Sequence, residues 1–184
     1  MTGATPWKTS ESHPLRIDAV AVPGTSAALG MTLCPGKKQP GGSGGAWWRD
    51  LDTDLAAIRA WGATALLTLF EEHEFGELQV AALPERARAH GLDWRHWPIR
   101  DQHPPDERFE RHWHREFPGL RRRLETGESL VLHCMGGLGR TGTVAAKILA
   151  EFGECPRVAV RRVREARRGA IETEAQLRYV LGSG

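Results

Sequence analysis

The chain has 184 residues, enough for one domain with a full-sized core, and its 40% hydrophobic and 26% charged residues are typical of a globular protein. A formal net charge of +2 is too small to indicate a nucleic acid partner, so none is expected. No apolar run reaches the roughly 18 residues of a membrane span, the first residues lack an apolar signal core, and three irregularly spaced cysteines do not make a disulfide framework. We therefore expect a reduced, cytoplasmic protein with no membrane partner.

The first part of the chain is expected to form a flexible N-terminal segment, a pair of strands and a loop. Residues 1–14 are polar and are expected to be flexible, whereas residues 15–184 are expected to form a single domain. Residues 16–22 and 27–33 alternate as two strands of a hairpin. Residues 35–45 are rich in glycine and proline, which predicts a flexible loop.

Helices alternate with buried strands in the middle of the chain. Asp50 or Asp52 is expected to cap a helix that runs to Trp61 and ends at Gly62. The remaining segments predict a buried strand over residues 65–70, a helix over 75–90 closed by Gly91, and a strand over 92–99.

The last part of the chain continues this alternation. Asp106 opens a predicted helix over residues 106–125 that is expected to break at Pro118 and Gly119. Predicted next are a strand over 129–133, a helix over 141–152, a helix from Pro156 to near Gly169, and a last helix opened by Thr173 with Gln176 as a capping box. The order predicts an α/β fold with a central, mostly parallel sheet flanked by helices.

The segment over residues 131–142 joins a buried strand to a helix through a glycine-rich turn. Gly136, Gly137 and Gly139 let the backbone point successive N–H groups at one anion, and the N-terminus of the following helix adds its positive dipole end. Arg140 supplies a planar fork that matches two phosphate oxygens. The same field favours the thiolate of Cys134, which is the nucleophilic form of cysteine.

Two residues that flank this turn support the same chemistry. His133 is placed to orient the loop through its ring nitrogens, and the hydroxyl of Thr141 is expected to face the Cys134 sulfur. A phosphate or another oxyanion is therefore the expected occupant of the loop formed by Met135, Gly136, Gly137, Leu138, Gly139 and Arg140.

The pattern His-Cys-x5-Arg-Thr at residues 133–141 resembles the signature of the protein tyrosine and dual-specificity phosphatase superfamily. The Gly-Gly-Leu-Gly-Arg filling at 136–140 is similar to the kinase-associated phosphatase type, as are the segments at 33–36, 98–101 and 171–176. The resemblance spans roughly residues 30–180 and implies that residues 15–184 are one catalytic domain with the phosphatase fold.

The resemblance also implies roles for individual residues. Cys134 would be the nucleophile, Arg140 the clamp on the phosphate, and Asp101 the general acid, with Asp106 as the nearest competitor for that role. Gln176 would either cap the last helix or position the hydrolytic water. No metal or other cofactor is expected, because Arg140 and the loop amides neutralise the phosphoryl oxygens.

Three functions stay open on the sequence. The first is dual-specificity hydrolysis of phosphotyrosine, phosphoserine and phosphothreonine in a phosphorylated protein substrate. The second is hydrolysis of a phosphoinositide, an inositol phosphate or an RNA 5′ phosphate, which the uncharged residues 135–139 disfavour. The third is a phosphoprotein-binding module that uses the same loop without turnover.

Some features of the chain have no assigned role. Cys34 and Cys155 are expected to be small buried hydrophobes, or else a redox partner of Cys134. Trp47 and Trp48, after the glycine-rich stretch, are either a substrate wall or core contacts.

Overall fold

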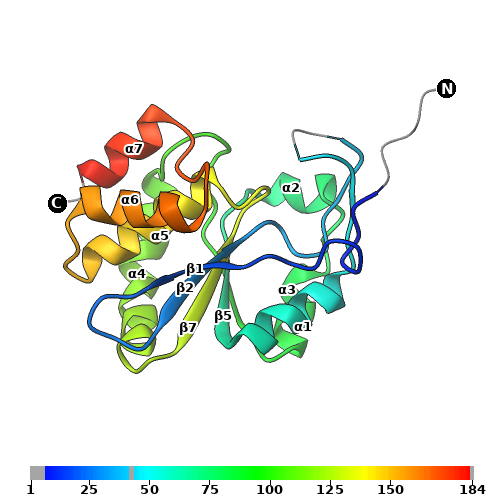
Figure 1. Ribbon diagram of the computed structural model, residues 1–184, viewed down its shortest axis with the longest axis horizontal. Coiled ribbons are helices and arrows are strands. Elements are labelled where there is room, and N and C mark those ends of the chain that lie inside the picture. The colour runs from blue at the N-terminus through cyan, green and yellow to red at the C-terminus, as the bar shows by residue number, and fades with distance from the viewer. Residues whose placement is uncertain (1–6, 42–43, 183–184) are drawn as a thin grey trace.

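The computed structural model describes residues 7–41 and 44–182, and a five-stranded sheet in the order β1-β2-β7-β5-β6 lies at its centre (Figure 1). β1 and β2 form an antiparallel hairpin, and the other pairs in this sheet are parallel. The mostly parallel sheet is thus confirmed. Its strands are β1 (Asp18–Ala21), β2 (Ala28–Thr32), β5 (Ala63–Thr68), β6 (Asp93–His96) and β7 (Ser129–His133).

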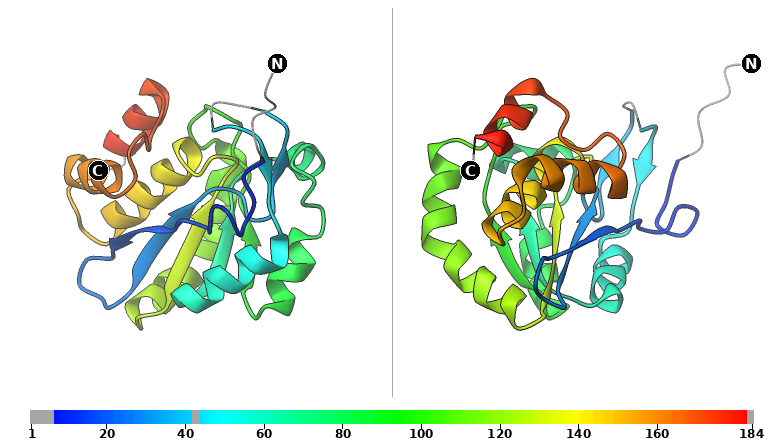
Figure 2. Two further views of the ribbon diagram at one scale, coloured as in Figure 1. Left: turned by 45° about the vertical axis from the view of Figure 1, so that its right-hand side comes forward. Right: turned by 60° about the vertical axis from the view of Figure 1, so that its left-hand side comes forward.

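Helices cover both faces of the sheet (Figure 2), which confirms the α/β architecture. Leu130 and Leu132 of β7 enter the core on one face, and Val131 between them enters the core on the other, as the alternation of a strand requires. The helices α4 (Glu107–Glu125), α5 (Gly139–Glu151), α6 (Pro156–Ala166) and α7 (Glu174–Leu181) cover the first face; α1 (Leu51–Trp61) and α3 (Leu83–Ala89) cover the second.

The helix ends follow the predicted capping chemistry. Asp50, not Asp52, caps α1 by accepting a hydrogen bond from a backbone N–H, and Gly62 ends that helix with a left-handed φ of 106°. Asp106 caps α4, and Thr173 with Gln176 forms the capping box of α7.

The predicted single helix over residues 75–90 is wrong, because the segment holds two short helices, α2 (Glu72–Glu77) and α3. Gln79 adopts a left-handed φ of 55°, which ends the first helix. Pro84 has no N–H to donate and occupies the first turn of the second helix, where none is needed.

The predicted break at Pro118 is also wrong, because α4 runs through it without interruption. The proline costs one backbone hydrogen bond. The apolar face on both sides of it is nevertheless anchored in the core, so tertiary packing outweighs local propensity. The buried residues of this face are Phe109, Trp113, Phe117, Leu120 and Leu124.

The described part of the glycine-rich segment contains a strand that the sequence did not predict. This strand, β3 (Lys38–Gln39), pairs with β4 (Trp47–Trp48) in a second, two-stranded sheet, and residues 42–43 lie outside the described residues. The described residues of the expected flexible N-terminal segment, from 7 onward, also contact the rest of the chain, and the flexibility of residues 1–14 stays a prediction. Lys8 forms a bridge with Trp47, and the buried Ser10 hydroxyl donates to Asp54 at 2.9 Å. Residues 1–6 lie outside the description.

The carboxyl ends of the parallel strands meet at one edge of the sheet. Thr32, His133, Thr68 and His96, the last residues of their strands, stand in register across it. In open α/β sheets this edge is where ligands bind. Within the described part of the chain, no helix is long and apolar enough to cross a membrane.

Candidate active site

Cys134 follows directly after β7, at the mouth of α5. It is buried, with 3% of its surface exposed, and the Thr141 hydroxyl donates a hydrogen bond to its sulfur at 3.1 Å. The predicted contact between these two residues is confirmed. The helix begins at Gly139, two residues earlier than expected, with neither a side-chain cap nor an acidic residue in its first turn. Its dipole is therefore free to act on an anion beside Cys134.

The loop after Cys134 has its carbonyl groups occupied by neighbouring segments. Arg167 donates to the carbonyls of Gly137 and Gly136, at 2.6 and 3.1 Å, and the N–H of Cys34 donates to the carbonyl of Met135 at 3.2 Å. Among the described residues, no acceptor pairs with the backbone N–H groups of residues 135–138. Such a row of unpaired N–H groups fits an oxyanion.

Of the loop glycines, Gly137 has a clear steric requirement. Its φ is 71°, and a Cβ atom there would lie 2.1 Å from the carbonyl oxygen of Thr32. Gly136 is different, because a Cβ atom would meet nothing within 4 Å. The close turn against β2 thus depends on one glycine of the run.

Arg140 lies at the base of the loop with 2% of its surface exposed. Its two terminal nitrogens donate to the Glu74 carboxylate at 2.7 and 2.9 Å, and Nη1 also donates to the Ile99 carbonyl at 3.1 Å. Burial alone would lower the pKa of Arg140, but the hydrogen bonds with Glu74 and the charges of Cys134, Glu74 and Asp101 raise it. Nε is buried and has no partner among the described residues, which fits a phosphate oxygen.

Asp101 reaches the loop from the connection that follows β6. Its Oδ1 lies 3.1 Å from Nη2 of Arg140, and its side chain is 56% exposed. Asp106 instead binds the first turn of α4 and Arg108. Of the two candidates, Asp101 is therefore the one that contacts Arg140 and lines the pocket over Cys134, within reach of a leaving group.

His133 is fully buried and forms a hydrogen-bonded chain beneath Cys134. Its Nδ1 donates to the Cys134 carbonyl at 3.3 Å, so Nε2 accepts from the Thr68 hydroxyl at 2.7 Å, which in turn accepts from the Trp94 indole N–H. Burial lowers the pKa of His133 to about 3, so the ring is neutral near pH 7. These contacts orient the start of the loop, as the sequence predicted.

Gln176 serves the backbone in this structure. Its Oε1 accepts from the N–H groups of Glu172 and Thr173, and its Nε2 donates to the carbonyl of His103, which joins α7 to the Asp101 loop. The capping role is confirmed, and a role in positioning water stays a prediction.

A pocket of about 450 Å³ opens over Cys134. Trp47 of β4 forms part of its wall, whereas Trp48 is 52% exposed and lies outside the pocket lining. The charged residues of the lining are Lys37, Asp101, Arg140, Arg167 and Glu172. The Gly-rich segment and α6 therefore contribute cations that lie outside the signature, and residues 135–139 alone are a poor guide to the pocket charge.

Four contributors to the site were missed by the sequence interpretation: Glu74, Lys37, Arg167 and, as a definite wall residue, Trp47. Glu74 and Arg167 are separated from the loop by dozens of residues and carry no local motif. The sole available signal was the excess of Arg over Lys, which indicates oxyanion binding in general and no position in particular.

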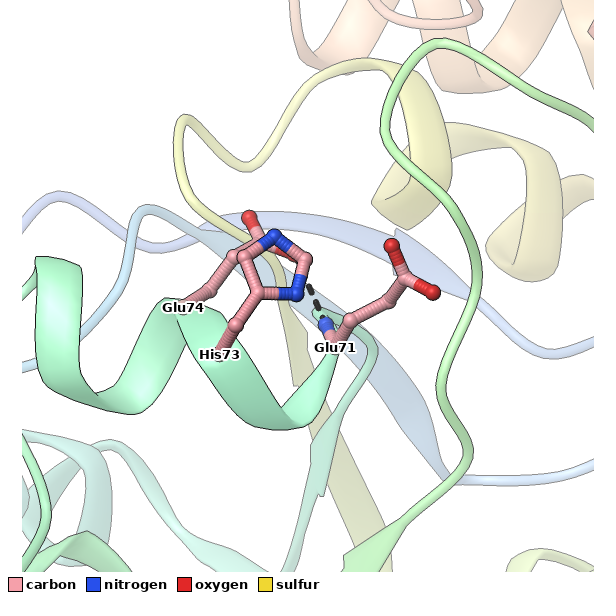
Figure 3. A group of neighbouring side chains, drawn as sticks. All are labelled: Glu71, His73 and Glu74. Atoms are coloured by element: carbon pink, nitrogen blue, oxygen red, sulfur yellow. Dashed lines mark hydrogen bonds between the residues drawn. The ribbon is translucent and has the colours of Figure 1, made fainter.

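Glu71, His73 and Glu74 form a group whose potential ligand atoms lie within 4.8 Å of one another (Figure 3). Both Glu74 oxygens accept hydrogen bonds from Arg140, and Glu74 also accepts from the Glu71 backbone N–H at 2.7 Å. Glu71 Oε1 accepts from Arg108. Within this group, Glu74 anchors Arg140. The expectation that the chemistry needs no metal stays a prediction.

The cysteines differ in their distance from the loop. Cys34 is buried beside Met135, and burial raises the pKa of its thiol. Cys155 is exposed, so the expectation that it is buried is wrong. It lies past the far end of α5, roughly 20 Å along that helix from the loop, and is too far away for a disulfide with Cys134. Pairing of Cys34 with Cys134 stays a prediction.

Comparison with known proteins gives relatives of one kind. Over 135 residues the chain is 27% identical to cyclin-dependent kinase inhibitor 3 of Rattus norvegicus, which covers 72% of this chain and 62% of that protein. Over 96 residues it is 34% identical to protein tyrosine phosphatase type IVA 2 of Mus musculus, which covers 52% of this chain and 54% of that protein. The chain thus spans less than two thirds of the length of these relatives.

A solved structure is similar to this chain over most of its length. The crystal structure of kinase associated phosphatase, with serine in place of its catalytic-site cysteine, matches with a TM-score of 0.79 at 25% identity, over 91% of this chain and 92% of that one. Residues 49–180 match the family described as PTP-SAK, the Swiss Army Knife protein DSP-PTPase phosphatase domain. The chain belongs to this DSP-PTPase family of cysteine-based phosphatases.

Proposed function

We propose that the chain hydrolyses phosphate monoesters through a phosphocysteine intermediate, with residues 15–184 as the catalytic domain. The observation that carries the proposal is the arrangement of Cys134 at the N-terminus of α5, within a loop whose backbone N–H groups over residues 135–138 have no acceptor among the described residues. Arg140 adds a buried guanidinium with a free Nε. These are the donors that a phosphoryl group in transfer requires.

In the first step, the Cys134 thiolate attacks phosphorus, an S–P bond forms and the ester P–O bond breaks. The Asp101 carboxyl group gives its proton to the leaving oxygen. Arg140 and the loop amides hold the three equatorial oxygens, where charge accumulates. A phosphate held by Arg140 competes with Asp101 for Nη2, from which Oδ1 lies 3.1 Å away, and so releases the exposed Asp101 carboxyl group to act.

In the second step, water attacks phosphorus, the S–P bond breaks and Asp101 takes the proton that water gives up. The Thr141 hydroxyl, 3.1 Å from the sulfur, stabilises the departing thiolate by a hydrogen bond. The products are inorganic phosphate and the free hydroxyl group.

We further propose that the substrate is a phosphorylated protein bearing phosphotyrosine, phosphoserine or phosphothreonine. The likeness to cyclin-dependent kinase inhibitor 3 and to protein tyrosine phosphatase type IVA 2 supports this substrate class. Small multiply phosphorylated substrates are the second candidate, and the observation that favours them is the presence of Lys37 and Arg167 in the pocket lining. The cytoplasmic location stays a prediction.

One panel of assays tests the proposal. Phosphate release is measured from p-nitrophenyl phosphate, from phosphotyrosine, phosphoserine and phosphothreonine peptides, and from inositol phosphates. We expect turnover of p-nitrophenyl phosphate and of the peptides, abolished in Cys134→Ser, which still binds. Retained phosphopeptide binding with no turnover of any compound would make the chain a binding module and refute the enzymatic proposal.

A further inference from the structure

Lys37 is a buried cation in the active-site pocket, and no carboxylate in the described part of the chain pairs with it. It has 5% of its surface exposed and lines the pocket over Cys134. The other two cations of the lining are neutralised, since Arg140 pairs with Glu74 and Arg167 pairs with Asp18 at 2.8 Å. No carboxylate among the described residues lies within ion-pairing distance of Lys37.

The contacts that the Lys37 ammonium does make are weak. Nζ donates to the carbonyl of Met135 and to Oε1 of Gln39, both at 3.4 Å, and lies 5.2 Å from the centre of the Trp47 ring. Three N–H donors with two long hydrogen bonds leave capacity for a ligand. Burial lowers the pKa of Lys37, and a bound anion would offset that desolvation.

The backbone of Lys37 is held in place from both sides. The N–H of Arg49 donates to the Lys37 carbonyl at 3.1 Å, and the N–H of Gly36 donates to Asp54 at 2.9 Å. Arg49 and Asp54 form a buried ion pair at 2.8 Å. The backbone from which the Lys37 side chain extends is therefore held in place, which reduces the ordering cost of binding an anion.

We propose that Lys37 binds a second anionic group of the substrate, a carboxylate or phosphate on the residue next to the phosphorylated one in a peptide. The Met135 contact places Nζ beside the first residue of the loop after Cys134, so the second anion would lie adjacent to the scissile phosphate. Trp47 would contact the apolar part of the peptide between the scissile phosphate and the second anion. This inference deepens the proposed function and rests on it.

The distribution of charge in the pocket favours a phosphopeptide over an inositol phosphate, whose ring carries phosphates on all sides. Asp101 and Glu172 also line the pocket, and they repel additional phosphates in their vicinity. Lys37, the cation of the lining that has no carboxylate partner among the described residues, comes from the glycine-rich segment alone. A ligand with its second anion on one side, such as a phosphopeptide with an acidic neighbour, matches that asymmetry.

Binding to the Cys134→Ser chain, measured by calorimetry, tests the inference without turnover. Three peptides are compared: a phosphotyrosine peptide with neutral neighbours, the same peptide with an adjacent glutamate, and the same peptide with an adjacent second phosphate. We expect one or both anionic neighbours to bind about tenfold more tightly than the neutral peptide, the scale of one hydrogen bond to a charged group. Lys37→Met is expected to remove this ratio and Lys37→Arg to keep it.

Lys38→Met is the matched control, because it makes the same change one residue further along, and Lys38 is absent from the pocket lining, with Nζ 5.7 Å from the Trp48 ring centre. Its affinity ratio should equal that of the parent chain. Equal loss for neutral and anionic peptides in Lys37→Met would assign the residue to the loop and overturn the inference. Inositol phosphates are titrated in the same way, and a dependence of affinity on Lys37 that is seen with them but not with the peptides would also overturn the inference. Equal affinity of the parent chain for all three peptides would overturn it as well.

The two proposals fail separately. Wild-type turnover of p-nitrophenyl phosphate, which has no second anion, reports on the phosphatase chemistry alone. A wild-type chain without turnover but with a Lys37-dependent affinity ratio would refute the chemistry and retain the subsite. Turnover, together with a ratio of anionic to neutral peptide affinity that Lys37→Met leaves unchanged, would support the chemistry and refute the subsite.

Discussion

Glu74 and Arg140 form a buried, bidentate ion pair across 66 residues of sequence, with N–O distances of 2.7 and 2.9 Å. The pair fixes the plane of the guanidinium that faces the loop. It also links α2, on one side of the cleft, to the first turn of α5. The position of the phosphate clamp is therefore set by a residue outside the signature segment.

Glu74→Gln should lower both stability and activity, because it leaves the buried Arg140 charge without its partner. We expect the free energy of unfolding to fall by about 3 kcal/mol and kcat/KM for p-nitrophenyl phosphate to fall about a hundredfold. Urea unfolding and steady-state kinetics measure these quantities. Glu77→Gln, an exposed residue of the same helix, is the control; equal effects of the two changes would contradict the anchoring role.

Gly137→Ala should disrupt the loop, whereas Gly136→Ala should be tolerated. At Gly137 the new Cβ would combine a left-handed φ with a 2.1 Å approach to the Thr32 carbonyl, and at Gly136 it would meet nothing. We expect the free energy of unfolding of Gly137→Ala to fall by about 2 kcal/mol, together with loss of vanadate binding. Similar stability and vanadate affinity in the two variants would show that the loop does not need this turn.

Asp101→Asn should slow hydrolysis of esters with poor leaving groups by roughly 10²–10⁴-fold, the usual contribution of a general acid. Esters with good leaving groups need less proton donation and should be affected less. Asp106→Asn should instead keep the wild-type rates over the whole leaving-group series, because asparagine caps α4 about as well as aspartate does. Rates measured over a leaving-group series decide between the two residues: a strong dependence in the Asp106 variant would refute the assignment.

Thr141→Val should slow the breakdown of the phosphocysteine intermediate about tenfold, because the departing sulfur loses its 3.1 Å hydrogen bond. A rapid burst of p-nitrophenol followed by a slower steady state is expected in stopped-flow measurements. Thr141→Ser keeps the hydroxyl and should behave like the wild type. If serine and valine give the same steady-state rate, the hydroxyl has no part in this step.

His133 should make stability depend on pH below neutrality. The pKa of this buried imidazole falls from 6.5 to about 3 on folding. Between these pH values the imidazole is protonated in the unfolded chain and neutral in the folded chain. Its contribution is complete above pH 6.5 and declines as the pH falls towards 3, by about 1.4 kcal/mol per pH unit. Urea unfolding at pH 6.5 and 5 should show a loss about 2 kcal/mol larger in the wild type than in His133→Gln. Parallel losses would contradict the buried neutral state.

The sequence predicted the parts of this fold that local chemistry controls. Asp106 and Gly62 mark helix ends through their own hydrogen bonds and backbone freedom, and the apolar run at residues 129–133 forms the central strand. The helix over 75–90 and the break at Pro118 were predicted wrongly. In the first case Gln79 adopts a left-handed φ, and in the second the core holds the helix together.

The candidate site likewise contains residues that the local sequence predicts and residues that only the fold brings together. The loop from Cys134 to Arg140 and the hydroxyl of Thr141 belong to one continuous segment, so the spacing predicted their geometry. Glu74, Lys37 and Arg167 reach that loop only through the fold, and nothing near them in sequence marks the contact. The pocket charge was therefore underestimated from the loop residues alone.

The most direct test of the chemistry is the mass of the Cys134 peptide after reaction. Wild-type protein is mixed with p-nitrophenyl phosphate, quenched in acid within the burst phase, digested and analysed by mass spectrometry. We expect one phosphoryl group on Cys134 and none in Cys134→Ser. Turnover with phosphate on another residue, or with no phosphoryl-enzyme at any quench time in either wild type or Thr141→Val, would contradict this chemistry.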